Sequence, residues 1–208
     1  MADDEYAATF DPDHLSAEAA VRRAANSGNA EAQFRLGVMY GNGEGVGLDY
    51  ERARHWFERA AAQGHENALI TLAWMFANGT GVVMDEDRAR ELYIAAAKRG
   101  SAKAQYVVGT MYRFAQYGAP KDIAQAVKWY LKAADQGMPT AQFALGRMLM
   151  DGKGVVRDDA AALQWLSLAH VNGSKRAEDY IQELLKRMDP VEVRAIRDRM
   201  TENAKSAG

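Results

Sequence analysis

The stretch AQFRLGVMYGNGEGVGLDYERARHWFERAAAQG, residues 32–64, holds two helical patterns on either side of a glycine-rich segment. In its second half, apolar residues recur after Asp49 at the spacing of one face of an amphipathic helix. These residues are Ala53, Trp56, Phe57, Ala60 and Ala61. Asp49 is placed to accept hydrogen bonds from the first backbone N–H groups, and Gly64 can adopt the left-handed conformation that ends a helix. The sequence therefore predicts a helix between these two residues, which we call the B helix.

The first half of the same stretch predicts a second helix, the A helix, over Ala32–Tyr40. Small and apolar residues share one of its faces, where they allow a neighbouring helix to come close. They are Ala32, Leu36, Gly37 and Tyr40. The glycines that follow, Gly41, Gly43 and Gly45, resemble a phosphate-binding loop, but such a loop follows a β-strand and occurs once in a domain. We interpret them as turn residues that link the two helices.

This two-helix pattern is repeated along the chain. Glycines that close a B helix stand 36, 36, 37 and 36 residues apart, at Gly28, Gly64, Gly100, Gly137 and Gly173. Further A helices are predicted over residues 68–76, 104–112 and 141–149. Residues 13–28 match a B helix without its A helix, and residues 177–185 match an A helix alone. A charged helix is predicted from Asp189 and Pro190 to about residue 203. Such repetition is typical of a helical solenoid.

The combined pattern is Ala-x3-Leu-Gly-x2-Tyr, GxGV, Asp-x3-Ala-x2-Trp-Phe-x2-Ala-Ala and a closing glycine, which residues 32–64 carry almost completely. It resembles the Sel-one-like repeat, a relative of the tetratricopeptide repeat. The resemblance implies an all-α fold: a right-handed α/α superhelix of about four 36-residue helix-turn-helix repeats, with an N-terminal half-repeat and C-terminal capping helices. It also implies a concave face formed by A helices, as in adaptor and scaffold proteins, and no chemistry.

The expected organisation is a single solenoid over residues 13–203, with an acidic, flexible segment at 1–12 and a short tail at 204–208. Within the solenoid we expect a half-repeat at 13–31, a C-terminal cap at 177–203, and four repeats at 32–67, 68–103, 104–140 and 141–176.

The composition narrows the classes of function. The chain has 208 residues, a formal net charge of −2 and no cysteine, which excludes disulfides, thiolate metal sites and a cysteine nucleophile. This charge gives no general reason to expect binding to nucleic acid. No apolar run approaches the length that spans a bilayer, so we expect no membrane insertion. The amino terminus lacks the pattern of a signal peptide, so we expect a cytoplasmic protein, or a periplasmic or secreted one if a leader has been removed.

Two positions of each A helix lie opposite its small, apolar face on a helical wheel. They are Phe34 and Val38, Ile70 and Trp74, Tyr106 and Thr110, and Phe143 and Arg147. The resemblance to tetratricopeptide repeats implies that these positions face the concave groove. Our hypothesis is an apolar and aromatic floor that binds an extended peptide or an amphipathic helix, with an ionic contact from Arg147. Trp74 and Arg147 are the stronger candidates, because packing alone does not require the variety seen at the second position.

Alternatives remain open for these sites. Aromatic residues at the first position would also serve simply to pack neighbouring A helices together. In the third repeat, an irregular loop with Arg113, Phe114, Gln116 and Tyr117 replaces the glycines, as a second contact site or as a surface insertion. The acidic N-terminal segment is a solvated tail, or it folds back on the groove through Tyr6 and Phe10.

No arrangement of residues predicts catalysis. The histidines, at 14, 55, 65 and 170, occupy different positions of the repeat and form no metal-binding motif. We therefore predict no catalytic, cofactor-binding or metal-binding residue, and a non-enzymatic adaptor that binds a protein or peptide partner. The resemblance places such a role in bacterial signalling, envelope or host-interaction pathways. The alternatives are a homo-oligomeric assembly module, and a ligand-binding or enzymatic solenoid acting on cell-wall material, as suggested for cysteine-rich relatives whose disulfides this chain lacks.

Overall fold

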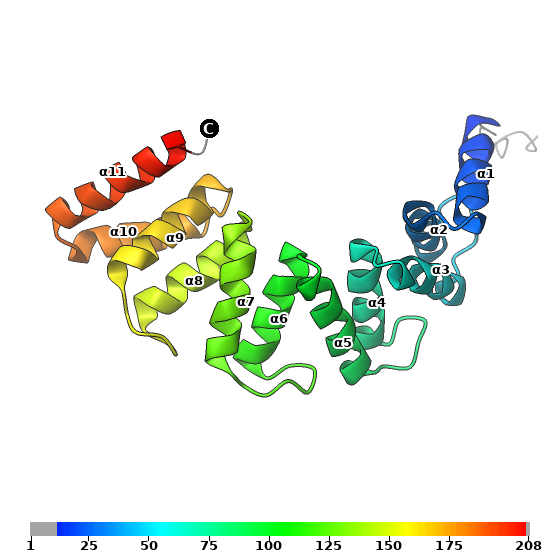
Figure 1. The fold of residues 1–208 in the computed structure, drawn as a ribbon, viewed down its shortest axis with the longest axis horizontal. Coiled ribbons are helices and arrows are strands. Elements are labelled where there is room, and N and C mark those ends of the chain that lie inside the picture. Colours follow the sequence, from blue (N-terminus) through cyan, green and yellow to red (C-terminus); the bar gives the residue numbers. More distant parts are fainter. Residues whose placement is uncertain (1–11, 207–208) are drawn as a thin grey trace, which may run out of the picture. The chain divides into compact units, whose positions relative to one another are not determined.

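The computed structural model describes residues 12–206, with side chains from 17 to 202, and every regular element in this part of the chain is an α-helix (Figure 1). The helices are α1 (Pro12–Asn26), α2 (Ala30–Asn42), α3 (Tyr50–Ala62), α4 (Glu66–Asn78), α5 (Glu86–Lys98), α6 (Ala102–Phe114), α7 (Ile123–Asp135), α8 (Pro139–Asp151), α9 (Asp159–Val171), α10 (Ala177–Arg187) and α11 (Pro190–Ser206). The all-α repeat fold predicted from the sequence is confirmed. The acidic segment with Tyr6 and Phe10 lies outside the described residues.

Side-chain caps begin most of the helices, as the sequence predicts. Asp49 accepts a 2.9 Å hydrogen bond from the backbone N–H of Arg52, and Asp122 and Asp158 cap α7 and α9 in the same way. The A helices use other caps, which are Asn29 for α2, His65 for α4 and Ser101 for α6. These caps lie three residues before the first predicted A-helix residue, so each A helix begins and ends about two residues further out than its apolar pattern suggests.

A glycine in the middle of the A helix lets the A and B helices of one repeat touch. A Cβ atom on Gly37 would lie 2.6 Å from the ring of Phe57. The same close approach joins Gly109 of α6 to the ring of Tyr130 at 2.7 Å. Contacts this short leave no room for a methyl group, so the predicted role of the small residues in close helix packing is confirmed.

The third repeat keeps the loop geometry of the others without their glycines. In repeats one, two and four the residue after the A helix is a left-handed glycine, whereas here it is Ala115 with φ 54°. Tyr117, with φ 52°, likewise stands where the other repeats have Gly45, Gly81 and Gly154. The one extra residue of this repeat lies in the loop before Asp122. The backbone N–H of Asp122 still donates a 2.8 Å hydrogen bond to the carbonyl of Tyr112. The loop predicted to be irregular therefore preserves the turn, with two non-glycine residues in left-handed backbone.

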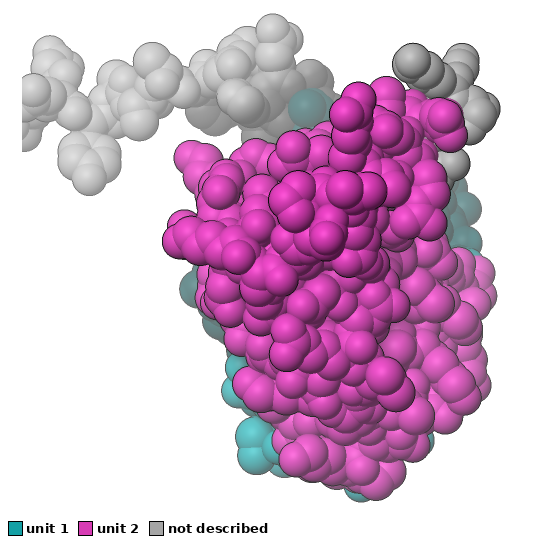
Figure 2. All heavy atoms as spheres, turned by 90° about the vertical axis from the view of Figure 1, so that its left-hand side faces the viewer, with its two compact units in different colours: residues 1–96 teal, residues 97–208 magenta. Residues whose placement is uncertain are grey.

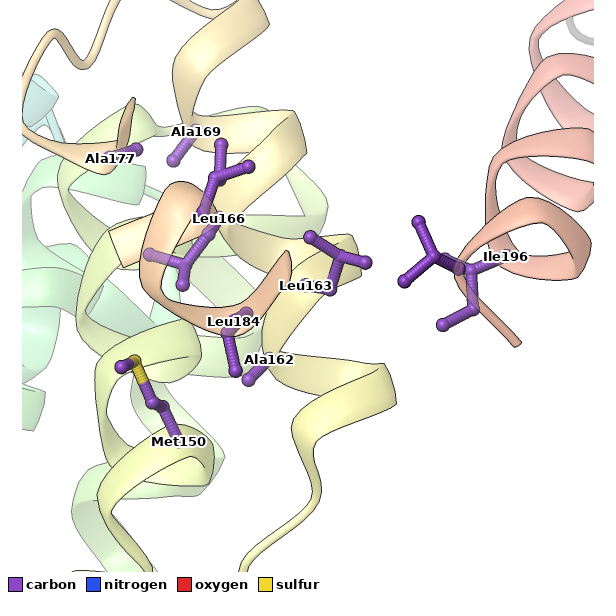
Figure 3. Packing of buried hydrophobic residues seen from close by; sticks show 10 residues of the cluster. Met150, Ala162, Leu163, Leu166, Ala169, Ala177, Leu184 and Ile196 are labelled. Atoms are coloured by element: carbon purple, nitrogen blue, oxygen red, sulfur yellow. The ribbon is translucent and has the colours of Figure 1, made fainter. Parts of the chain in front are cut away.

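The chain divides into two compact units, residues 1–96 and 97–208, which Figure 2 draws in teal and magenta. Unit 2 ends in an apolar cluster in which α9 and α10 pack with α11 (Figure 3). Ile196 of α11 and Leu184 of α10 are fully buried there, and Ile196 is directed towards Leu163 of α9. The terminal helix predicted to be a polar cap thus has one apolar face that closes the core of the last repeat.

Candidate functional site

An apolar pocket of about 150 Å³ opens in unit 1 among α2, α3 and α4. Two of the predicted groove residues, Val38 and Trp74, form part of its wall. Trp74 is 51% exposed, which is unusual because tryptophan side chains are mostly buried in folded proteins. The remaining lining residues are Gly41, Asn42, Tyr50, Ala53, Phe57, Thr71, Met75 and Thr80.

The other two predicted groove residues of unit 1, Phe34 and Ile70, do not line this pocket. The ring of Phe34 stacks on the imidazole of His65, with 4.7 Å between centroids, and lies 5.6 Å from the ring of Phe57. Ile70 is half-buried on α4. His65 is held in place because its Nδ1 accepts the N–H of Ala68 and its Nε2 lies 2.9 Å from a carboxylate oxygen of Glu31. Phe34 therefore packs against the start of the next A helix.

In unit 2, Tyr106 and Thr110 lie against a residue of the B helix. The ring centroids of Tyr106 and Tyr130 are 5.5 Å apart, and the hydroxyls of Thr110 and Tyr130 are 3.1 Å apart. Burial raises the pKa of Tyr130, and hydrogen bonds with Thr110 and Arg113 partly offset this rise. Thr110 thus satisfies a buried phenol, which gives it a packing role in the described structure.

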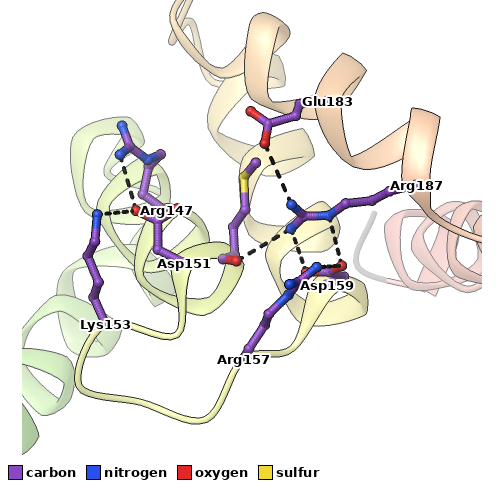
Figure 4. A network of polar contacts seen from close by, with 8 residues as sticks. Arg147, Asp151, Lys153, Arg157, Asp159, Glu183 and Arg187 are labelled. Carbon is purple, nitrogen blue, oxygen red and sulfur yellow. Dashed lines mark hydrogen bonds and ion pairs between the residues drawn. The ribbon is translucent and has the colours of Figure 1, made fainter.

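Phe143 and Arg147 of α8 belong to a cluster with Tyr180 of α10. The guanidinium carbon of Arg147 lies 4.3 Å from the centre of the Tyr180 ring, and Nη1 donates a 2.6 Å hydrogen bond to the Tyr180 hydroxyl. Phe143 meets Tyr180 edge-on at 5.4 Å, and the guanidinium of Arg176 covers the Phe143 ring at 5.3 Å. Arg147 also pairs with Asp151 (Figure 4). Its side chain is directed mainly at residues of the same unit.

The same network joins α10 to α9 through Asp159. Arg157 and Arg187 both bond the Asp159 carboxylate, at distances of 2.7 to 3.0 Å (Figure 4). The hydrogen bond from Arg157 is the largest cause of the low pKa of Asp159, about 2, and Arg187 adds to it. Glu183 lies beside Arg187, and Lys153 bonds Asp151. These contacts have the character of structural ion pairs, because Arg187 links α10 to Asp159 of α9 and the others join residues of one helix or of the loop beside it.

The loop of the third repeat presents one exposed aromatic side chain. Phe114 is exposed, and the guanidinium of Arg113 lies 5.0 Å from the centre of its ring. Gln116 is exposed, and its backbone N–H bonds the carbonyl of Met111. Tyr117 is half-buried. Loop residues predicted as one contact site are therefore oriented by different partners.

Sequence reasoning missed part of the pocket wall. Tyr50, the first residue of α3, is 42% exposed and lines the pocket, and Thr71 and Met75 complete the wall on α4. Thr71 and Met75 each follow a predicted groove position directly in the sequence, so widening the predicted stripe by one residue finds them. Tyr50 gives no such signal, because it belongs to a B helix that the groove hypothesis left out.

The chemistry of the site is that of a binding surface. Between residues 17 and 202, no group of three or more His, Cys, Asp or Glu side chains could hold a metal ion. The residues of the pocket wall are mainly apolar, and their polar side-chain groups are the hydroxyls of Thr71, Thr80 and Tyr50, the amide of Asn42 and the indole N–H of Trp74. Such a wall can bury an apolar side chain but supplies no base or nucleophile. Within residues 12–206, no helix is long and apolar enough to cross a bilayer.

Repeated pairs of helices, joined by the same turns and packed through the same contacts, define an all-α helical-repeat protein. The model of the Sel1 repeat matches residues 30–65, 67–101, 102–138 and 139–169, and the chain belongs to this family. Sel1 repeats are typically protein-interaction modules, and their solenoids are generally non-catalytic.

Two solved structures of Sel1-type proteins are similar to the chain over most of its length. A Sel1 repeat protein from Oxalobacter formigenes is 31% identical, with a TM-score of 0.77 and coverage of 90% of this chain and 79% of its own. A protective antigen of uropathogenic Escherichia coli strains with an SLR fold is also 31% identical, with a TM-score of 0.76. That match covers 88% of this chain but only 40% of the antigen. No curated protein matches the sequence.

Proposed function

We propose that this chain is a non-catalytic adaptor that binds a protein partner through the pocket between α2 and α4. The observation that carries the proposal is the half-exposed Trp74 at the wall of an apolar pocket of about 150 Å³. Tryptophan and tyrosine are the side chains most often found at the energetic centre of protein interfaces, and Tyr50 stands on the same wall.

The size and polarity of the pocket indicate what it takes from a partner. A volume of about 150 Å³ accommodates a single large apolar side chain. The wall residues carry the hydroxyls of Thr71, Thr80 and Tyr50, the amide of Asn42 and the indole N–H of Trp74, and these groups can bond the backbone on either side of that side chain. The proposed ligand is therefore a partner segment that inserts one aliphatic or aromatic residue. By family resemblance, the partner belongs to bacterial signalling, envelope or host-interaction pathways.

Site-specific photo-crosslinking tests this proposal in cells of the source organism. A photoreactive phenylalanine analogue at Thr71 should crosslink a partner, whereas the same probe at Val156, an 88% exposed loop residue of unit 2, should not. Trp74→Ala should weaken partner binding about thirtyfold or more, because truncating a side chain at the energetic centre of an interface costs at least about 2 kcal/mol. Leu131→Ala, at an exposed apolar residue of α7, is the matched control.

The outcomes separate three cases. A crosslinked partner that depends on Trp74 but not on Leu131 supports the adaptor. Identical crosslinks from Thr71 and Val156, or none from Thr71, contradict it. A crosslinked product that contains two copies of this chain would replace it with the homo-oligomeric alternative.

A further inference from the structure

Five exposed cations of unit 2 lie at the end of α5, at the start of α6 and on α7. Lys98 and Arg99 close α5, and Lys103 lies in the first turn of α6. Lys128 and Lys132 lie four residues apart on one face of α7, the face that ends at Gln136. Gln136 fixes the position of that face, because its Nε2 donates a 2.9 Å hydrogen bond to the carbonyl of Gly100. We call these five residues the basic edge.

Most of the basic edge is specific to this part of the chain. Arg59 and Arg176 stand at the repeat positions of Lys132 and Lys103, whereas no other described repeat has Lys or Arg at the positions of Lys98, Arg99 and Lys128. Where the second repeat has Lys98, Arg99 and Lys103, the third repeat has Asp135, Gln136 and Thr140. The second repeat has Glu91 and Ala95 where the third has Lys128 and Lys132. Packing therefore does not require cations at the positions of Lys98, Arg99 and Lys128.

Arg99 replaces a residue with a structural role in other repeats. At its position, Gln63, Gln136 and Asn172 each donate a hydrogen bond to a buried glutamine of the A helix. In the second repeat that glutamine is replaced by Leu69, which has no side-chain oxygen to accept such a bond. Arg99 is exposed. Because Leu69 and Arg99 replace this hydrogen-bonded pair, the guanidinium of Arg99 remains available at the basic edge.

None of the five cations forms an ion pair with a carboxylate in the described part of the chain. Asp135 is exposed one turn after Lys132, without an ion pair between them. Lys132 instead covers the ring of Trp129, with 4.5 Å from Nζ to the centroid. Lys103 stands at the positive end of the α6 dipole, where a cation is unfavourable for the helix. The arrangement concentrates positive charge that the fold itself leaves uncompensated.

Charge is also divided unequally between the units. Residues 1–96 contain 16 Asp and Glu against 8 Lys and Arg, and residues 97–208 contain 12 against 18. The formal charges are therefore −8 and +6, which give the net charge of −2. An anion is drawn to unit 2 and repelled by unit 1. This favours a short anionic segment over a long polyanion such as nucleic acid, which would extend beyond the basic edge.

We propose that the basic edge of Lys98, Arg99, Lys103, Lys128 and Lys132 binds an acidic segment of a protein partner. Carboxylates of the segment pair with these cations, and an aromatic residue of the segment packs beside Trp129. The surface is separate from the pocket of Val38 and Trp74, which belongs to unit 1. The chain thus offers one apolar and one electrostatic contact surface.

The test uses the full chain and a fluorescent peptide of about ten residues composed of Glu, Asp and Tyr. Binding should weaken at least about tenfold between about 50 and 300 mM salt. The double variant Lys128→Glu, Lys132→Glu should lose a further tenfold or more, because each change replaces attraction with repulsion. The matched control, Lys186→Glu with Arg194→Glu, changes the same charge on α10 and α11.

Salt-sensitive binding that the edge variant loses and the control variant keeps supports the proposal. Equal loss in both variants, or no binding at about 1 mM peptide, overturns it. An oligothymidine of similar length that binds as tightly as the peptide also overturns it, in favour of a nucleic-acid surface. Unchanged helical circular dichroism of both variants verifies that the fold is intact.

Discussion

Gln63 donates a 2.7 Å hydrogen bond from its Nε2 to the Oε1 of Gln33, a side chain that is only 1% exposed. Gln33 in turn donates to the carbonyl of Ala25 at 3.1 Å. One buried amide therefore joins three consecutive helices, α1, α2 and α3. The same arrangement recurs around Gln105 and around Gln142.

Breaking this arrangement on one side should be costly. Gln33→Leu leaves the carbonyl of Ala25 and the amide of Gln63 without their partner, which should lower the free energy of unfolding by about 1 to 3 kcal/mol. Adding Gln63→Arg reproduces the Leu69 and Arg99 pair of the second repeat and should recover part of that loss. Urea denaturation of the two single variants and the double variant measures the coupling. Strictly additive effects would show that the two side chains do not act as a pair.

Close helix packing at Gly37 should not tolerate a methyl group. Gly37→Ala places Cβ 2.6 Å from the Phe57 ring and should cost about 1 to 3 kcal/mol of stability, despite the better helix propensity of alanine. Gly41→Ala in the same helix places Cβ 3.7 Å from Ala53, an ordinary contact, and should be neutral or stabilising. Thermal unfolding of the two variants compares them directly. A Gly37→Ala protein as stable as Gly41→Ala would contradict the close approach.

The left-handed backbone at Ala115 should make glycine the better residue there. Ala115→Gly removes the steric cost of φ 54° and should raise stability by about 0.5 to 1 kcal/mol. Ala195→Gly, at an exposed position inside α11, should have the opposite sign, because glycine weakens a helix interior by a similar amount. Chemical denaturation gives both values. If both glycines destabilise, the loop does not hold Ala115 in this conformation.

The ion pairs at Asp159 should make stability depend on acid pH. Its pKa of about 2 in the fold lies below the ordinary value of 3.8, so the ionised carboxylate stabilises the folded state. That contribution is complete above pH 3.8 and is lost as the pH falls towards 2. With partial screening by solvent, the loss should be about 1 to 2 kcal/mol.

Unfolding free energies at about pH 5 and about pH 2 test this for the wild type and for Asp159→Asn. The variant should be less stable at the higher pH and should lose less stability on acidification. Asp135→Asn, at an exposed carboxylate without an ion pair, is the control and should follow the wild type. A wild-type slope in Asp159→Asn would mean that other carboxylates carry the acid sensitivity.

Helix boundaries could be predicted because their causes are local. Asp49 caps α3 through the N–H of a residue three positions later, and Gly64 ends the turn through its own backbone conformation, φ 80°. The candidate site was only partly predictable. The wheel identified Val38 and Trp74, which line the pocket, but the role of Tyr50 depends on how the start of a B helix meets the next A helix.

The sequence by itself determined the repeat, the helices and the absence of thiol chemistry, because these follow from residue identity and from spacings within a few turns. The tertiary structure decided which side chains are available to a partner. Arg147 lies at a groove position of its helix, yet it bonds Tyr180, a residue 33 positions later. Trp74 lies at the equivalent position and stays half exposed. Packing between residues distant in sequence makes this distinction, because helical periodicity orients a side chain but does not say what it meets.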